Sequence, residues 1–318
     1  MSTSVTGPDP PWSGRRESVD TRWQHDDMTA VTVAERAAPN VATLLPFVLV
    51  SFAANSLITR HVVRRDLLDA GLLTGVRFTS GAVALLLLTY SRRERPVIGR
   101  GNVAPASWLG VYAVCISYGY QHIGAAPGTF VFYATVLVTL VALDLVRRTP
   151  VPPRRLAGAV VALAGLGVLA SRAAGTVTPL GVALLAATGA AWGLYTAAGR
   201  TSADPRVATT GHFVVLAAAL LPLSAVLLSP LTDARVTASG LVWAMVMGAG
   251  TTAFAYVAWY ACQRAMSATS AGTVQLVIPV LTALGAVVLL DEQVTVQLAI
   301  AATLVALGMW LAASRRLP

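Results

Sequence analysis

Polar and aromatic side chains recur at helical spacing inside apolar segments of this chain. The longest stripe places polar or aromatic residues at i, i+4, i+7, i+8 and i+11, namely Thr252, Tyr256, Trp259, Tyr260 and Gln263. Shorter sets of the same kind are Asn55 and Thr59, then Thr188, Trp192 and Tyr195, and then Gln275, Pro279 and Thr282. Tyr118 and Tyr133 lie singly in two further apolar segments. Polar groups in an apolar segment avoid lipid, so they must face other helices or a water-filled cavity. Such a cavity could orient a small solute and strip its water, without covalent chemistry.

Two interpretations of these side chains stay open. The residues that we take as candidates for a substrate cavity are Asn55, Arg77, Tyr118, Tyr133, Trp192, Tyr195, Tyr256 and Gln275. The alternative is hydrogen bonding between helices, with Trp and Tyr at the membrane interfaces. Trp259, Tyr260 and Tyr120 lie near segment ends, which favours the interface for these three.

Ionisable groups inside apolar segments are costly, so each needs a partner or a role. Arg77 could be the counter-charge of a carboxylate substrate, or it could extend outward or bond to carbonyls of a neighbouring helix. Asp144 lies three and four residues before Arg147 and Arg148, which favours an ion pair on one helix. His122 and His212 are isolated from acids in the sequence, so we expect hydrogen-bonded helix residues.

Pro279 and Glu292 are the candidates for a hinge or a gate. Pro279 lacks an amide hydrogen, so it frees a carbonyl on the preceding turn and bends its helix. Glu292 follows Asp291 in a short turn, where it could cap the last helix or act in outer gating.

Patterns typical of an enzyme or of a metal protein do not occur in the sequence. It contains no HExxH, paired-acid or Ser/His arrangement, so we expect no catalytic residues, metal or cofactor. Cys115 and Cys262 lie in apolar segments and are expected to be small apolar fillers.

The composition is that of a membrane protein. Of 318 residues 56% are hydrophobic and 12% charged, whereas a soluble domain has roughly a quarter charged. All 23 basic residues are Arg, and together with 14 acidic residues they give a formal net charge of +9. Because they lie in loops beside apolar segments, where positive charge sets orientation, we expect no nucleic-acid partner.

The sequence predicts a disordered cytoplasmic tail followed by ten membrane helices. Residues 1–42 are polar and rich in Pro, and translation could start at Met1 or at Met28. The predicted membrane spans, each long enough to cross roughly 30 Å of hydrocarbon, are 43–60, 71–90, 105–121, 125–146, 155–172, 178–198, 208–229, 239–262, 270–290 and 295–313. The excess of Arg in alternate loops favours both termini in the cytoplasm.

Two long stretches of the chain resemble each other. One apolar stretch begins at Gly128-Thr129 and ends at Leu166-Gly167. The other begins at Gly272-Thr273 and ends at Leu307-Gly308. Ten spans in two halves leave five spans in each half. An odd number forces the second half to enter the bilayer from the other side. We therefore predict two inverted five-helix repeats, 43–172 and 178–314.

The stretch from Ala268 to Ser314 resembles the second repeat of EamA-type members of the drug/metabolite transporter superfamily. The resemblance lies in Gly272-Thr273, Pro279-Val280 in mid-helix, an acid at Glu292 and the ending Ala306-Leu307-Gly308. Arg77 also matches a position where that family often has Arg. The first repeat departs from this pattern, with Thr135 in place of Pro279 and Arg148 near the counterpart of Glu292.

This resemblance implies an inner-membrane carrier, often an exporter, of a small metabolite, amino acid or drug. The expected mechanism is alternating access between two halves, with the bilayer and a small solute as partners and a homodimer left open. The alternatives are a flippase of a lipid-linked substrate on the same scaffold and, with less support, a membrane-embedded enzyme. The sequence leaves substrate, direction and coupling undetermined.

Overall fold

The computed structural model describes residues 40–171, 177–227, 235–290 and 293–313. The chain forms two units, Met1–Asn40 and Val41–Pro318. The predicted tail, 1–42, lies outside the described residues up to residue 39, and the described helices belong to the second unit.

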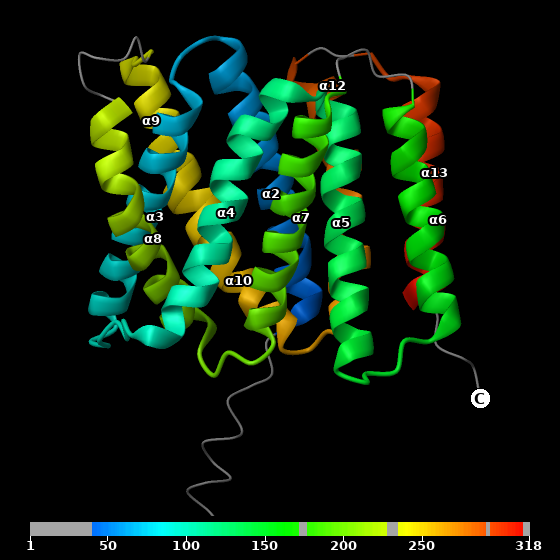
Figure 1. Cartoon of the computed structure of the whole chain (residues 1–318), viewed down its shortest axis with the longest axis horizontal. Coiled ribbons are helices and arrows are strands. Elements are labelled where there is room, and N and C mark those ends of the chain that lie inside the picture. The colour runs from blue at the N-terminus through cyan, green and yellow to red at the C-terminus, as the bar shows by residue number, and fades with distance from the viewer. Residues whose placement is uncertain (1–39, 172–176, 228–234, 291–292, 314–318) are drawn as a thin grey trace, which may run out of the picture. The chain divides into compact units, whose positions relative to one another are not determined.

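The described part of this unit is helical and contains no strand (Figure 1). Its helices are α2 (Val41–Arg64), α3 (Ala70–Ser91), α4 (Arg100–His122), α5 (Ala125–Val146), α6 (Pro153–Ala170), α7 (Pro179–Gly199), α8 (Pro205–Leu227), α9 (Ala238–Val246), η1 (Met247–Phe254), α10 (Ala255–Gln263), α11 (Ala268–Gln275), α12 (Val277–Leu290) and α13 (Val296–Ala313). Helices α9, η1 and α10 follow one another without a loop and make one span, and α11 and α12, separated only by Leu276, make another. The described helices therefore form ten segments, which correspond to the ten predicted spans.

Among the described residues, nine of these segments are long and apolar enough to cross a membrane. The tenth, α4, carries polar residues such as Arg100, Asn102 and Gln121, which lower its apolarity. The prediction of an all-helical membrane protein with about ten spans is confirmed.

Successive segments alternate in direction, so that α2 begins and α13 ends at the same end of the bundle (Figure 1). We call this the terminal end; it includes the loops 92–99, 147–152, 200–204 and 264–267. The other end, called the mouth end, includes the loops 65–69, 123–124, 177–178 and 235–237.

The two halves are inverted repeats, and equivalent helices pack against each other. Helix α3 packs on α8, α5 on α11 and α6 on α13. Phe78 and Phe213 each lie eight residues after the first residue of α3 and of α8, and their ring centroids are 5.3 Å apart. The pseudo-twofold axis that relates the two halves therefore passes close to this pair of rings.

Small residues bring α6 and α13 into close contact. A Cβ atom added at Gly158 would lie within 3.0 Å of the carbonyl oxygen of Gly308, and the reverse also holds. Only glycine fits at such a crossing, as in other tight helix pairs in membranes.

Two threonines form hydrogen bonds that join neighbouring loops at the mouth end. Thr178 caps α7 and donates from Oγ1 to the carbonyl oxygen of His122 (2.9 Å). Thr237 caps α9 and donates in the same way to the carbonyl oxygen of Leu67 (2.7 Å). These bonds hold neighbouring loops together around the mouth end of the bundle.

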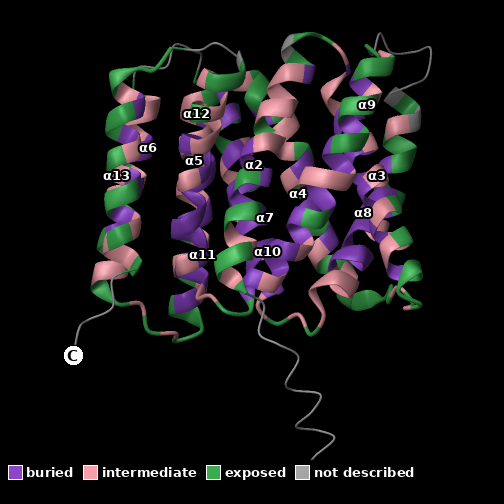
Figure 2. Cartoon of the chain, turned by 180° about the vertical axis from the view of Figure 1, so that it is seen from behind, coloured by how far each residue is buried: buried purple, intermediate pink, exposed green. Residues whose placement is uncertain are grey.

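The most buried segments lie in the middle of the bundle, and the pair α6 and α13 lies at one side (Figure 2). The span in α7 is 56% buried, whereas that in α13 is 22% buried. The predicted interfacial position of Trp259 and Tyr260 is wrong, because both side chains are fully buried beside α7. Trp259 Nε1 donates to Thr196 Oγ1 (3.3 Å), and Tyr260 Oη donates to the carbonyl oxygen of Tyr195 (3.0 Å).

Candidate functional site

A cavity of about 710 Å³ lies between the two halves. Helices α2 to α6 of the first half and α7, α10, α11 and α12 of the second half contribute to its wall. The volume falls in the range of pockets that hold small organic ligands, roughly 300–1,000 Å³.

The cavity opens toward the mouth end and is closed toward the terminal end. Its rim contains exposed residues such as Val63 and Tyr120, which lie near the mouth-end termini of α2 and α4. Its floor contains the buried side chains of Phe52, Trp192 and Tyr256. A solute could therefore enter from the mouth end and stop at an aromatic layer in the middle of the bundle.

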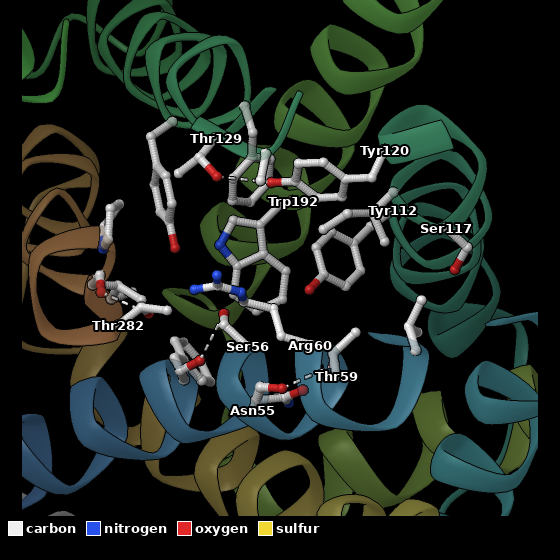
Figure 3. A pocket seen from close by; sticks show the side chains of 18 of the residues that line it. Asn55, Ser56, Thr59, Arg60, Tyr112, Ser117, Tyr120, Thr129, Trp192 and Thr282 are labelled. Carbon is white, nitrogen blue, oxygen red and sulfur yellow. Dashed lines mark hydrogen bonds between the residues drawn. The ribbon is translucent and has the colours of Figure 1, made fainter. Parts of the chain in front are cut away.

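Aromatic rings form a continuous floor. Phe52 contacts Trp192 and Tyr256 edge to face, with centroid distances of 5.7 and 5.5 Å. Tyr112 lies beside Trp192 at 5.0 Å, and Figure 3 shows its ring next to the indole. Such a surface can cover the apolar part of a ligand and exclude water from it.

A hydrogen bond fixes the indole ring of the floor. Trp192 Nε1 donates to Gln275 Oε1 (2.5 Å), and Gln275 Nε2 donates to the carbonyl oxygen of Ala271 (2.9 Å). Both side chains are buried, so the bond holds Trp192 in one orientation between α7 and α11.

One wall of the cavity is polar. Asn55 Nδ2 donates to Thr252 Oγ1 (3.0 Å), and Arg77 Nη1 donates to Asn55 Oδ1 (3.4 Å). Figure 3 shows further polar side chains around the cavity, namely Ser56, Thr59 and Arg60 from α2, Ser117 and Tyr120 from α4, Thr129 from α5 and Thr282 from α12. The arrangement offers hydrogen-bond donors and positive charge above an aromatic floor.

Both halves of the bundle resemble known proteins. A family model described as "EamA-like transporter family" matches residues 41–171 and 179–314. The chain belongs to the EamA-like transporter family. The family is part of the drug/metabolite transporter superfamily, as the sequence predicted.

Two known proteins are similar to this EamA-like transporter. The uncharacterized protein PA1977 of Pseudomonas aeruginosa is 37% identical over 274 residues, which cover 85% of this chain and 93% of that protein. A solved crystal structure superposes with a TM-score of 0.69 at 23% identity, and the match covers 84% of this chain and 97% of the other. The second likeness concerns the fold alone.

The cavity of this EamA-like transporter brings together most of the predicted cavity residues. Those that line it are Asn55, Arg77, Tyr133, Trp192, Tyr256 and Gln275. Tyr118 does not line it and is exposed, because Tyr112, Ile116 and Tyr120 present the other face of α4 to the cavity. Tyr195 does not line it either; it is fully buried and stacks on Trp192 at 5.6 Å, on the far side from the mouth.

The segment that contains Pro279 is interrupted at Leu276, three residues before the proline. Helix α11 ends at Gln275, α12 begins at Val277, and Pro279 itself lines the cavity. Its role as a hinge stays a prediction. Glu292, the other gating candidate, lies outside the described residues.

Some residues of the cavity wall were not predicted from the sequence. Arg60 is the last residue of the predicted first span, 43–60, but α2 continues to Arg64, and Arg60 lines the cavity. Tyr112 and Tyr120 share a helix face at i and i+8, a spacing that could have revealed them.

Asp144 forms a different ion pair from the one predicted. The buried carboxylate accepts a hydrogen bond from Arg200 Nη1 at Oδ1 (3.0 Å) and two from Thr269, from its amide and its hydroxyl, at Oδ2 (2.8 Å each). Arg147 and Arg148 are exposed beyond the last residue of α5, and neither is paired with Asp144 among the described ion pairs. Asp144 therefore joins α5 to α7 and α11 at the terminal end.

A second polar cluster is buried between the floor and the terminal end. His212 of α8 contacts the rings of Tyr195 and Tyr260, with centroids 5.7 and 5.5 Å away. The Nδ1 atom of His212 and both polar side-chain atoms of Gln263 are buried without a hydrogen-bond partner. The expectation that His212 is a hydrogen-bonded helix residue is therefore not met at this nitrogen. Unsatisfied buried polar groups of this kind call for a functional explanation.

The described residues contain no group of three or more His, Cys, Asp or Glu side chains that could hold a metal ion. Cys115 is half-buried and Cys262 is buried, and both are free thiols. What the site can do is bind and orient a solute of moderate size.

Proposed function

We propose that the chain is a secondary transporter that carries a small organic solute across the plasma membrane by alternating access. The observation that carries the proposal is a cavity built by both halves that is open at one end and sealed at the other. A carrier needs a site near the middle of the bilayer, at the interface of its repeats.

Contacts between the halves seal the terminal end. Asp144 of the first half bonds Arg200 and Thr269 of the second half. Between these contacts and the cavity lie the buried rings of Tyr195, Tyr260 and the aromatic floor. In the opposite state of a carrier these contacts would separate while the mouth end closes.

The buried cluster around His212 supports a second cavity, which would open at the terminal end in the opposite state of the carrier. His212 lies seven residues after the start of α8, and Arg77 lies seven residues after the start of α3. Inverted repeats give the two states cavities lined by equivalent positions. His212 and Gln263 are then polar because they face water when the terminal end opens.

Orientation and direction are part of the proposal. Arg residues gather in and beside the loops of the terminal end, which are those at 92–100, 147–155, 200–206 and 264. Fewer lie at the mouth end, so the terminal end and both chain termini are proposed to be cytoplasmic. The mouth would then face outward, and the family resemblance favours export.

Purified protein in vesicles would test this proposal with a panel of labelled amino acids, nucleosides, carboxylic acids and cationic drugs. We expect saturable flux of at least one solute, lost in Trp192→Ala and retained in Tyr118→Ala, whose side chain lies outside the cavity. Flux of no solute, together with lipid scrambling or with hydrolysis of a substrate, would instead support a flippase or an enzyme.

A further inference from the structure

The wall of the cavity contains a buried guanidinium, that of Arg77, which forms no ion pair with any acid among the described residues. Arg77 is 7% exposed, lines the cavity and lies over the Phe78 ring, with 4.6 Å between Cζ and the ring centroid. Its Nη1 reaches the neutral Asn55, and its Nε is buried without a hydrogen-bond partner. No ion pair of Arg77 occurs in the described part of the chain.

The acids in the described segments all have roles elsewhere. Asp66 pairs with Arg235, Asp69 caps α3, Asp144 pairs with Arg200, and Glu94 and Asp204 pair with Arg206. The described lining of the cavity contains Arg60 and Arg77 but no Asp or Glu. Among the described residues, Arg77 therefore places a positive charge in the wall of the cavity that no described acid offsets.

A buried cation that lacks an opposite charge is costly, and a ligand anion would remove much of that cost. Arginine matches carboxylates best, because its planar group can donate two parallel hydrogen bonds. On the floor of the same cavity, Phe52, Trp192 and Tyr256 offer an apolar surface that suits a ring or a branched chain. An ammonium group would find no carboxylate among the described lining residues.

We infer that the transported solute is a small organic carboxylate without a compensating ammonium group. Arg77 binds its carboxylate, Asn55 holds the guanidinium in place, and the aromatic floor covers the apolar part of the molecule. This inference rests on the proposed transport function and names the substrate class of the same site.

Binding of four matched probes to the purified full-length protein would test the inference. The probes are 3-phenylpropionate, its neutral amide, the cationic 3-phenylpropylamine and zwitterionic phenylalanine, measured by quenching of tryptophan fluorescence. We expect the carboxylate to bind about thirtyfold or more tightly than the amide, because the amide leaves Arg77 uncompensated. In Arg77→Gln this preference should disappear, while Arg77→Lys should retain part of it.

Equal affinity for the acid and the amide in the wild-type protein would overturn the inference, even if Arg77→Gln does not fold. A preference for the acid that survives in a folded Arg77→Gln variant would do the same. The flux panel keeps the two proposals apart. Saturable flux of a cation or a nucleoside, without binding of the carboxylate probe, would support the proposed transport function and contradict the proposed carboxylate substrate.

Discussion

Trp192 and Gln275 meet across the floor of the cavity, where the indole Nε1 donates a hydrogen bond to the side-chain oxygen 2.5 Å away. The two residues lie 83 positions apart, on α7 and α11. Both belong to the second half, so the bond fixes the indole ring of the floor within one repeat, while Asn55 and Arg77 of the polar wall come from the first repeat.

Replacement of Gln275 by Leu should remove the hydrogen bond that holds the Trp192 indole in the floor of the cavity. The indole N–H would then be buried without an acceptor, at a cost of about 1–3 kcal/mol. We expect a lower melting temperature and weaker solute binding. Trp192→Phe removes the donor and keeps an aromatic ring, so the double variant with Gln275→Leu should be less destabilised than the sum of the two single variants. Strict additivity of the two changes would count against the bond.

Asp144→Asn should weaken the seal at the terminal end. The neutral amide loses the ion pair with Arg200, which is partly exposed, and we expect a loss of about 1–3 kcal/mol in thermal unfolding. Arg147→Gln is the matched control, because Arg147 is exposed and makes no ion pair with Asp144 in the structure. If Arg147→Gln destabilised the protein as much as Asp144→Asn, the observed pairing would be wrong.

Gly308→Ala should disrupt the crossing of α6 and α13. Its Cβ would meet the carbonyl oxygen of Gly158, and the helices would have to separate at a cost of about 1–3 kcal/mol. Gly167→Ala on α6 should be tolerated, since its Cβ would lie 3.5 Å from Phe130 in an ordinary contact. Thermal stability in detergent measures both, and equal stability of the two variants would contradict this crossing.

The sequence predicted the positions of the helices better than it predicted which face of each helix points to the cavity and which residues contact each other. Apolar length and Arg-rich loops were sufficient for ten spans, and helical spacing was sufficient to select Asn55, Trp192, Tyr256 and Gln275 for the cavity wall. The side of α4 that faces the cavity depends on packing against α7 and α8, so Tyr118 was chosen in place of Tyr112.

Side-chain contacts between residues far apart in the chain could not be predicted from the sequence either. Asp144 has two basic neighbours in sequence, but its partner Arg200 lies 56 residues away, directly after the last residue of α7. Trp259 and Tyr260 lie at a segment end, where aromatic residues often face the membrane interface, yet the packing of α10 on α7 buries them.

Labelling of single cysteines from each side of the membrane tests alternating access most directly. The background carries Cys115→Ala and Cys262→Ala, and Ser56→Cys or Thr209→Cys is added singly. Ser56 is exposed in the cavity wall, and Thr209 is fully buried on α8, one turn before His212.

Our account predicts that a membrane-impermeant maleimide labels the Ser56→Cys variant only from the mouth side and the Thr209→Cys variant only from the terminal side. Adding Asp144→Asn should raise labelling at position 209 and lower it at position 56, because one end closes as the other opens. Labelling of both positions from the same side, or a rise at position 209 with no fall at position 56, would contradict alternating access.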